Sequence, residues 1–257
     1  MDANQIEVLL FVLGPAVASL AAGLLATVRP PGGKVRGAIL HFAGGVVFSV
    51  VAVELIPDLL REHAPVYTTL GFALGVATML GVRALLENDE AGEEGELEPT
   101  NAPTMGKASN TPRSSIPMAM LIATGVDLGV DGILLGIGFA AGAKEGRMLA
   151  FALATELIAL ALATVATLQR RGASRRSSLR ILGGLLGVFV ASAAIGTLLL
   201  ANLSGHALTF VLSFGCAALL FLVTEELLVE AHEEKETAWM TATFFAGFLL
   251  FLVIGVM

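Results

Sequence analysis

Three carboxylates lie inside stretches of this sequence that are otherwise almost wholly apolar. Asp127 and Asp131 share one apolar run, and Glu156 lies near the middle of the next run. Because residues four apart lie on one face of a helix, the two aspartates are expected to face the same way. Glu156 can meet them if the two helices pack antiparallel across the break at residues 142–147. The spacing therefore predicts a cluster of three carboxylates.

Such a cluster predicts a site for a cation or for protons. A charged residue at the centre of a membrane helix costs about 2.5–3.5 kcal/mol on insertion scales, and it usually has a function. The alternative is that these side chains face a polar crevice or pair with Lys or Arg, but no Lys or Arg falls within the two apolar runs. Oxygen ligands suit Mg²⁺, Ca²⁺, Mn²⁺ and Fe²⁺, and they favour Zn²⁺ less than His or Cys ligands do.

The composition is that of a membrane protein with several spanning helices. The chain has 257 residues, of which 56% are hydrophobic and 14% are charged, whereas soluble domains carry about 25% charged residues. The net charge is −7, and many of the acidic residues fall between Glu87 and Glu98. Cys216 is the single cysteine, so no intrachain disulfide can form. We expect an all-α polytopic membrane protein.

Eight stretches reach the length of about 20 apolar residues that a membrane helix needs. They cover residues 6–28, 37–60, 66–86, 116–141, 147–168, 180–201, 206–230 and 238–257. Residues 87–115, between the third and fourth stretches, are rich in Pro, Gly, Ser, Thr, Asn and Glu, which predicts a disordered acidic loop. Residues 1–257 then form a single transmembrane domain.

Basic residues in short loops predict the orientation of the helices. The loop after the first helix holds Arg29, Lys34 and Arg36, and the loop after the fifth holds five arginines between Arg170 and Arg180. Loops rich in Lys and Arg face the cytoplasm, so with eight helices both termini are expected outside and the 87–115 loop inside. The expected location is a bacterial inner (plasma) membrane.

An internal repeat links the second and seventh predicted helices. Residues 42–58 align without gaps on residues 214–230. These helices cross in opposite directions, so the copies have inverted topology, which is typical of secondary transporters with a midplane substrate site. The first three and last three helices would be the repeats, placed around the fourth and fifth. Acidic residues at the ends of the repeated helices predict waypoints on the path of a cation. These residues are Glu54, Asp58, Glu226 and Glu230. The alternative is that they are solvated helix ends.

The remaining polar and small residues predict structural roles. His41, His63, His206 and His232 fall at predicted helix ends, as interfacial histidines do. Glycines and other small residues on two helices predict close helix packing. They are Gly132, Gly136, Gly138 and Gly142 on the fourth helix, and Gly183, Gly184, Gly187, Ala191, Ser192 and Gly196 on the sixth. Neither a His-Glu-x-x-His motif nor a Gly-x-Ser-x-Gly motif occurs, so we do not expect an enzyme.

The chain resembles the ZIP (Zrt/Irt-like protein) family of divalent metal transporters over essentially its whole length. The second predicted helix contains Phe42-Ala-Gly-Gly and Val53-Glu54-Leu-Ile-Pro57-Asp58, similar to the family's Ala-Gly and Leu-Leu-Pro-Glu segments. The seventh contains Glu225-Glu226-Leu-Leu-Val-Glu230-Ala-His232, similar to Glu-Glu-Leu-Ile-Pro-Glu-Ala-His. Eight helices, outward termini and a variable third loop also fit the resemblance.

The metal-binding segments depart from the family pattern. The fourth helix of the family usually reads His-Asn-x-x-Glu/Asp-Gly, and aligning its end on Asp131 and Gly132 puts Asp127 at the histidine position. In the fifth helix, Glu156 takes the first ligand position. The resemblance therefore implies a primary metal site of Asp127, Asp131 and Glu156. A second metal position, which relatives complete with an acid in the sixth helix, is lost because residues 190–192 read Val-Ala-Ser.

The resemblance implies a transporter that moves a divalent cation such as zinc, manganese or iron into the cytoplasm by alternating access. The first, fourth, fifth and sixth helices would move against the others. Protons are expected to replace the metal on the carboxylates when it leaves. The expected partners are membrane lipid and a second copy of the chain in a homodimer, and no nucleic-acid partner is expected. The alternative is a ZIP-fold membrane protein that no longer transports metal and acts as a binding or sensing module.

Overall fold

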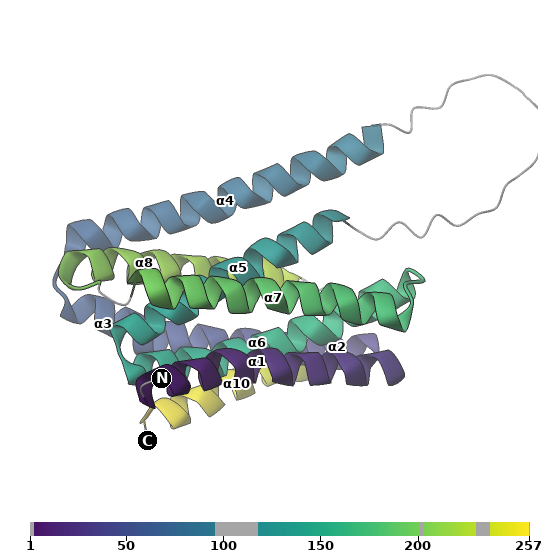
Figure 1. Ribbon diagram of the computed structural model, residues 1–257, viewed down its shortest axis with the longest axis horizontal. Coiled ribbons are helices and arrows are strands. Elements are labelled where there is room, and N and C mark those ends of the chain that lie inside the picture. The colour runs from purple at the N-terminus through teal and green to yellow at the C-terminus, as the bar shows by residue number, and fades with distance from the viewer. Residues whose placement is uncertain (1–2, 96–117, 201–202, 230–236, 257) are drawn as a thin grey trace, which may run out of the picture.

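The computed structural model is a bundle of long helices that lie side by side (Figure 1). It describes residues 3–95, 118–200, 203–229 and 237–256. The helices are α1 (Ala3–Val28), α2 (Gly33–Val50), α3 (Ile56–Arg61), α4 (Pro65–Gly95), α5 (Met118–Ala141), α6 (Ala143–Arg170), α7 (Arg175–Leu200), α8 (Gly205–Leu222) and α10 (Ala238–Val256). Two π-helical turns, η1 (Val51–Leu55) and η2 (Val223–Leu227), continue α2 and α8 without a break.

The eight expected membrane helices are confirmed within the described residues, which contain no strand and eight helical segments long and apolar enough to span a bilayer. The third and fifth segments extend past the predicted ends, because α4 continues to Gly95 and α6 begins at Ala143. The first residues of the expected 87–115 loop are thus helical, and its remainder lies outside the described residues. This architecture is that of an all-α, multi-pass membrane protein.

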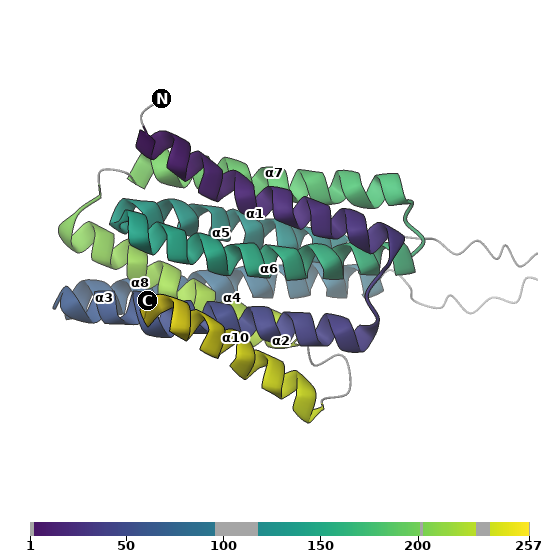
Figure 2. The same ribbon diagram turned by 90° about the horizontal axis from the view of Figure 1, so that it is seen from below.

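The helix ends gather in two groups at opposite ends of the bundle (Figures 1 and 2). The N and C termini, α3 and the α5–α6 turn lie at one end, which we call the terminal end. The α1–α2 and α6–α7 connections lie at the other, which we call the basic end. The basic residues of these two connections and their flanking turns are Arg29, Lys34, Arg36, Arg170, Arg171, Arg175, Arg176 and Arg180.

Two helix pairs pack closely through glycines. A side chain at Gly247 of α10 would collide with the Phe42 carbonyl oxygen of α2, and one at Gly75 of α4 would collide with the Phe214 carbonyl oxygen of α8. Each pair is also joined by a side-chain hydrogen bond. Thr243 Oγ1 donates to the Ala38 carbonyl at 3.1 Å, and Ser213 Oγ donates to the Thr68 carbonyl at 2.6 Å.

Small residues also bring α5 against α7. A Cβ atom at Gly132 would collide with the Phe189 carbonyl oxygen, and one at Gly136 would meet the backbone of Gly196. The prediction of close packing is therefore confirmed for these residues. It is wrong for Gly183, Gly184 and Gly187, where an added Cβ would meet nothing within 4 Å.

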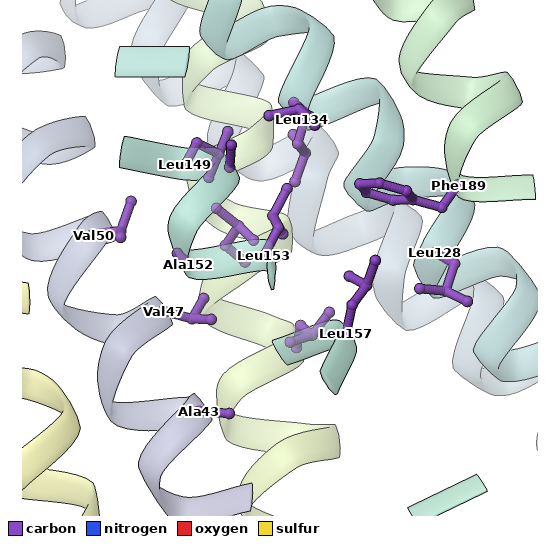
Figure 3. Packing of buried hydrophobic residues seen from close by; sticks show 14 of the residues in the cluster. Ala43, Val47, Val50, Leu128, Leu134, Leu149, Ala152, Leu153, Leu157 and Phe189 are labelled. Carbon is purple, nitrogen blue, oxygen red and sulfur yellow. The ribbon is translucent and has the colours of Figure 1, made fainter. Parts of the chain in front are cut away.

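The core is apolar and centred on α6. Figure 3 shows side chains of α2, α5, α6 and α7 gathered around this helix. Ala152, Leu153 and Leu157 of α6 are each at most 1% exposed, as are Val47 of α2 and Phe189 of α7. Since α6 is covered on several sides, the polar side chains on its covered faces, Glu156 and Thr164, are held within protein rather than against lipid.

Candidate metal centre

The structure brings Asp127, Asp131 and Glu156 together inside the bundle. Each residue offers one carboxylate oxygen, and these three oxygens lie within 4.8 Å of one another. Asp127 is 2% exposed, and Asp131 and Glu156 are 0% exposed. Both oxygens of Asp131 and of Glu156 are themselves buried, as is Oδ1 of Asp127. We call these residues the carboxylate triad.

The α5–α6 hairpin positions the triad. Gly142 is the single residue between the two helices, and its N–H donates to the Gly138 carbonyl at 3.1 Å while its carbonyl accepts from the Gly146 N–H at 2.9 Å. A Cβ atom at Gly138 would lie 3.3 Å from Cα of Gly146, so the two backbones approach closely beside the turn. Glu156 lies about as far along the chain from this turn as Asp127 and Asp131 do, which places all three at one depth.

That depth is near the middle of the membrane-spanning segments. The spans that carry the triad are Met120–Ala141 and Ala143–Arg170. Leu128 and Leu157, the residues next to Asp127 and Glu156, are 2% and 1% exposed and belong to the apolar cluster. The triad is therefore shielded from bulk water by aliphatic side chains, of which Leu128 and Leu157 are labelled in Figure 3.

The electrostatics of the triad favour a bound cation. Two unit charges 4.8 Å apart repel by on the order of 3–4 kcal/mol at an effective dielectric constant of about 20. A divalent ion removes this repulsion, and metal–oxygen bonds of about 2.0–2.6 Å place two ligand oxygens on one ion up to about 4–5 Å apart. The spacing of the three carboxylates thus fits a single ion coordinated by oxygen, and protons are the other species that could neutralise them.

The two sides of the triad differ in how open they are. Towards the terminal end, a void of about 10 Å³ is lined by leucines and their neighbours, including Leu134, Ile137 and Leu149. This volume is at the limit for one water molecule. Towards the basic end, a cavity of about 470 Å³ is lined by Thr124 of α5 and Leu160 of α6, among others. These two residues lie about one helical turn from Asp127 and Glu156, so the cavity comes within about a turn of the triad, which itself stays buried.

The predicted waypoints do not join the triad. Glu54 is buried in η1 at the terminal end, where Oε1 accepts from Nζ of Lys144 at 3.2 Å. Asp58 pairs with Arg61 at 3.1 Å. Of the other two waypoints, the side chain of Glu226 and the whole of Glu230 lie outside the described residues.

Lys144 is the ion-pair partner of the predicted waypoint Glu54, and the sequence did not predict this pair. The fifth helix was expected to begin at residue 147, which left Lys144 in a loop, whereas α6 begins at Ala143 and carries Lys144 in its first turn. The sequence could have suggested this pair, because Lys144 lies beside the α5–α6 break and the second predicted helix carries Glu54 and Asp58. Its ammonium group is the basic partner that the sequence did not assign to Glu54.

The histidines are not part of the triad, although one of them is buried. His63 and His206 are exposed near helix ends, as expected, and His206 stacks on Tyr67 with ring centroids 4.4 Å apart. His41 was also expected at a helix end, and this is wrong, because α2 begins at Gly33 and His41 is 4% exposed within it. Its Nδ1 donates to the Gly37 carbonyl at 2.8 Å. His232 lies outside the described residues.

No model of a known protein family matches this chain. No curated protein matches it either.

Proposed function

We propose that this chain is a membrane transporter of a divalent metal cation, with the carboxylate triad as its ion-binding site. One observation carries the proposal: three buried carboxylates from two adjacent spanning helices present oxygens within 4.8 Å of one another. Buried charges of one sign are stable only when a counter-charge or protons neutralise them. A site at this depth with ligands of this kind suits an ion in transit across a bilayer.

The expected inverted repeat is supported by the bounds of the helices. α2 and η1 run from Gly33 to Leu55, and α8 and η2 run from Gly205 to Leu227. These bounds match residue for residue under the alignment of residues 42–58 on 214–230. A π-helical turn is rare and is often found at functional sites, so two at equivalent positions favour a common origin for the two halves.

Helix packing supports the same repeat. Gly75 packs on the Phe214 carbonyl and Gly247 on the Phe42 carbonyl, and Phe42 and Phe214 are equivalent in the alignment. The contact between α2 and α10 in one half therefore corresponds to the contact between α8 and α4 in the other half. Inverted repeats of this kind permit alternating access around a fixed midplane site, and α5 and α6 occupy that central place here.

The direction of access follows from the cavity. The basic residues favour a cytoplasmic location for the basic end, with both termini outside. The cavity of about 470 Å³ would then approach the triad from the cytoplasmic side to within about one helical turn, while the triad itself stays buried. The oxygen ligands favour Mn²⁺, Fe²⁺, Mg²⁺ or Ca²⁺ as the transported ion. Zn²⁺ is a further candidate because of the resemblance to the ZIP family. Protons bind the triad when the metal departs.

Uptake of divalent ions into proteoliposomes tests the proposal. We expect saturable uptake of at least one of Zn²⁺, Mn²⁺, Fe²⁺, Co²⁺, Cd²⁺ and Mg²⁺ by the native chain. Asp131→Asn and Glu156→Ala should abolish it, because each removes a ligand. Glu145→Gln is the matched control, since this acid lies on α6 but outside the triad, and it should retain uptake.

Two results would count against transport. Undiminished uptake by folded Asp131→Asn protein would exclude the triad as the ion site. Absence of uptake of every ion by folded native protein, with metal binding retained, would favour the alternative of a binding or sensing module. That alternative shares the site and the fold but not the movement of the ion.

A further inference from the structure

The cavity at the basic end has a chemistry of its own. Its polar lining consists of three arginines and three threonines: Arg36, Arg170, Arg171, Thr124, Thr164 and Thr167. None of the residues that line it in the described part of the chain is acidic. Its volume of about 470 Å³ falls within the range of about 300–1,000 Å³ that is usual for small-molecule sites. A cation finds no ligand of opposite charge here, whereas an anion does.

Arg36 is the residue that sets this cavity apart from the rest of the basic end. It lies in the first turn of α2 and is 5% exposed, whereas Arg175 and Arg176 at the start of α7 are exposed. Orientation of the chain in a membrane explains exposed arginines in a loop. A guanidinium held inside the protein is less mobile than an exposed one, so less side-chain entropy is lost when it binds an anion in the cavity.

The Thr124 hydroxyl donates to the Met120 carbonyl at 2.9 Å, whereas Arg170 and Thr167 keep donors for a ligand. Arg170 Nη2 donates to Thr167 Oγ1 at 3.3 Å, so this hydroxyl accepts from the arginine and keeps its own proton to donate. A guanidinium carries five N–H donors in a planar fork, and one such bond leaves the others available. Thr164, which is 3% exposed, adds a second hydroxyl to the cavity lining.

We propose that this cavity binds a phosphate group, held by Arg36, Arg170 and Arg171 with the hydroxyls of Thr164 and Thr167. Guanidinium forks bind phosphate oxygens in pairs, and this geometry is the main reason that arginines recognise phosphate. The phosphate can come from free inorganic phosphate or from the headgroup of an anionic phospholipid, since basic pockets between membrane helices bind such headgroups. The site lies one turn from the triad but shares no residue with it, so phosphate binding does not depend on the proposed metal transport.

Equilibrium binding of radiolabelled inorganic phosphate to the purified full-length protein tests this site. The measurement is made in EDTA, with the protein in nanodiscs of phosphatidylcholine alone. We expect saturable binding that weakens by about tenfold or more in Arg36→Gln and in Arg171→Gln, as is expected for the loss of a hydrogen bond to a charged group. Arg175→Gln and Arg176→Gln are matched controls on the same end of the bundle and should bind as the native chain does.

A second arm distinguishes the two sources of phosphate. With phosphatidylglycerol in the nanodiscs, a headgroup in the cavity would compete with inorganic phosphate. Native mass spectrometry would then show anionic lipid retained by the native chain and lost from Arg36→Gln. Thr164→Val provides a milder variant in case an arginine variant fails to fold, and it should weaken binding by a smaller factor. The proposal is overturned if neither phosphate nor anionic lipid binds, or if the control variants lose binding as much as Arg36→Gln does.

Discussion

Asp131 is the residue on which the candidate site depends most. It is fully buried, and it shares a helix face with Asp127, one turn away. Its position was predictable because the four-residue spacing fixes the common face whatever the fold around it. The position of Glu156 followed from the hairpin. In both cases local helix geometry, which the sequence determines, was sufficient.

Metal binding should stabilise the native chain measurably. A ligand that binds only the folded state at 100 times its dissociation constant adds about 2.7 kcal/mol to the free energy of unfolding. We expect the melting temperature to rise on addition of the transported ion and to fall back with EDTA. Glu156→Gln should abolish this response yet melt higher than the native chain in EDTA, because it removes one of three buried acids that must repel one another or bind protons when no metal is present. A metal response that persists in this variant would place the ion elsewhere.

The Lys144–Glu54 pair should show a measurable coupling. Lys144 has a side chain that is 58% exposed, whereas Glu54 is 8% exposed, so the pair lies between a surface and a buried ion pair. In a double-mutant cycle of Lys144→Met and Glu54→Gln, we expect a coupling in unfolding free energy of about 1 kcal/mol. High salt should reduce it only in part. A coupling near zero would mean that the contact adds nothing to stability.

Other side-chain placements could not be read from the sequence. The burial of Arg36 and His41 depends on α2 starting four residues earlier than its apolar pattern indicates. The pairing of Lys144 with Glu54 likewise depends on the start of α6. A sequence pattern determines the ends of a helix less well than its middle. When an end shifts by one turn, the polar residues near it have different surroundings.

At the scale of elements, the close contact between α5 and α7 holds the hairpin in place. Gly132 and Gly136 let the two backbones meet without side chains between them. Helices within a membrane associate mainly through such packing, because lipid provides no hydrophobic force to bring them together. The position of the triad therefore depends on these glycines, although neither of them touches an ion.

A pair of glycine substitutions tests this dependence. Gly132→Ala should destabilise the protein by about 1–3 kcal/mol, because the added methyl collides with the Phe189 carbonyl oxygen. Gly183→Ala on α7 is the control, since its methyl meets nothing within 4 Å, and alanine favours a helix over glycine by about 0.5–1 kcal/mol. We expect thermal unfolding in detergent to separate the two variants in opposite directions. Equal melting temperatures would show that the α5–α7 contact tolerates side chains.

The sequence predicted the number and positions of the spanning helices but not η1 and η2. Spanning helices are recognisable because a run of about 20 apolar residues is typical of a membrane helix and rare in other structures. A π-helical turn differs from an α-helical one by a single accommodated residue, and no sequence pattern marks it. The matching bounds of the two turns became visible only in the structure.

At the scale of the molecule, the arrangement places both termini at the end opposite the arginine-rich connections (Figure 1). Ser174 lies on the α6–α7 connection at the basic end, and Ser204 lies just before α8 at the terminal end. Both are exposed, and each is close in size to cysteine. They therefore form a matched pair for topology mapping.

Labelling of cysteines substituted at these positions tests the orientation. In intact cells, a membrane-impermeant maleimide should label Ser204→Cys and should label Ser174→Cys only after the membrane is broken. The native Cys216 is 1% exposed and should remain unlabelled in both backgrounds. The reverse pattern would invert the proposed orientation, and labelling of both in intact cells would contradict the spanning arrangement.

The unequal openness on the two sides of the triad has an electrical consequence. Moving one elementary charge through the full membrane potential is worth about 2.3 kcal/mol per 100 mV. Because the cavity of about 470 Å³ lies on the basic side and the leucines between the triad and the terminal end are buried, we expect more of the voltage to fall on the terminal side of the triad. An ion that binds from the basic side crosses the smaller part of this field. A divalent ion from the other side would cross the larger part, so its apparent affinity should change more steeply with voltage on that side.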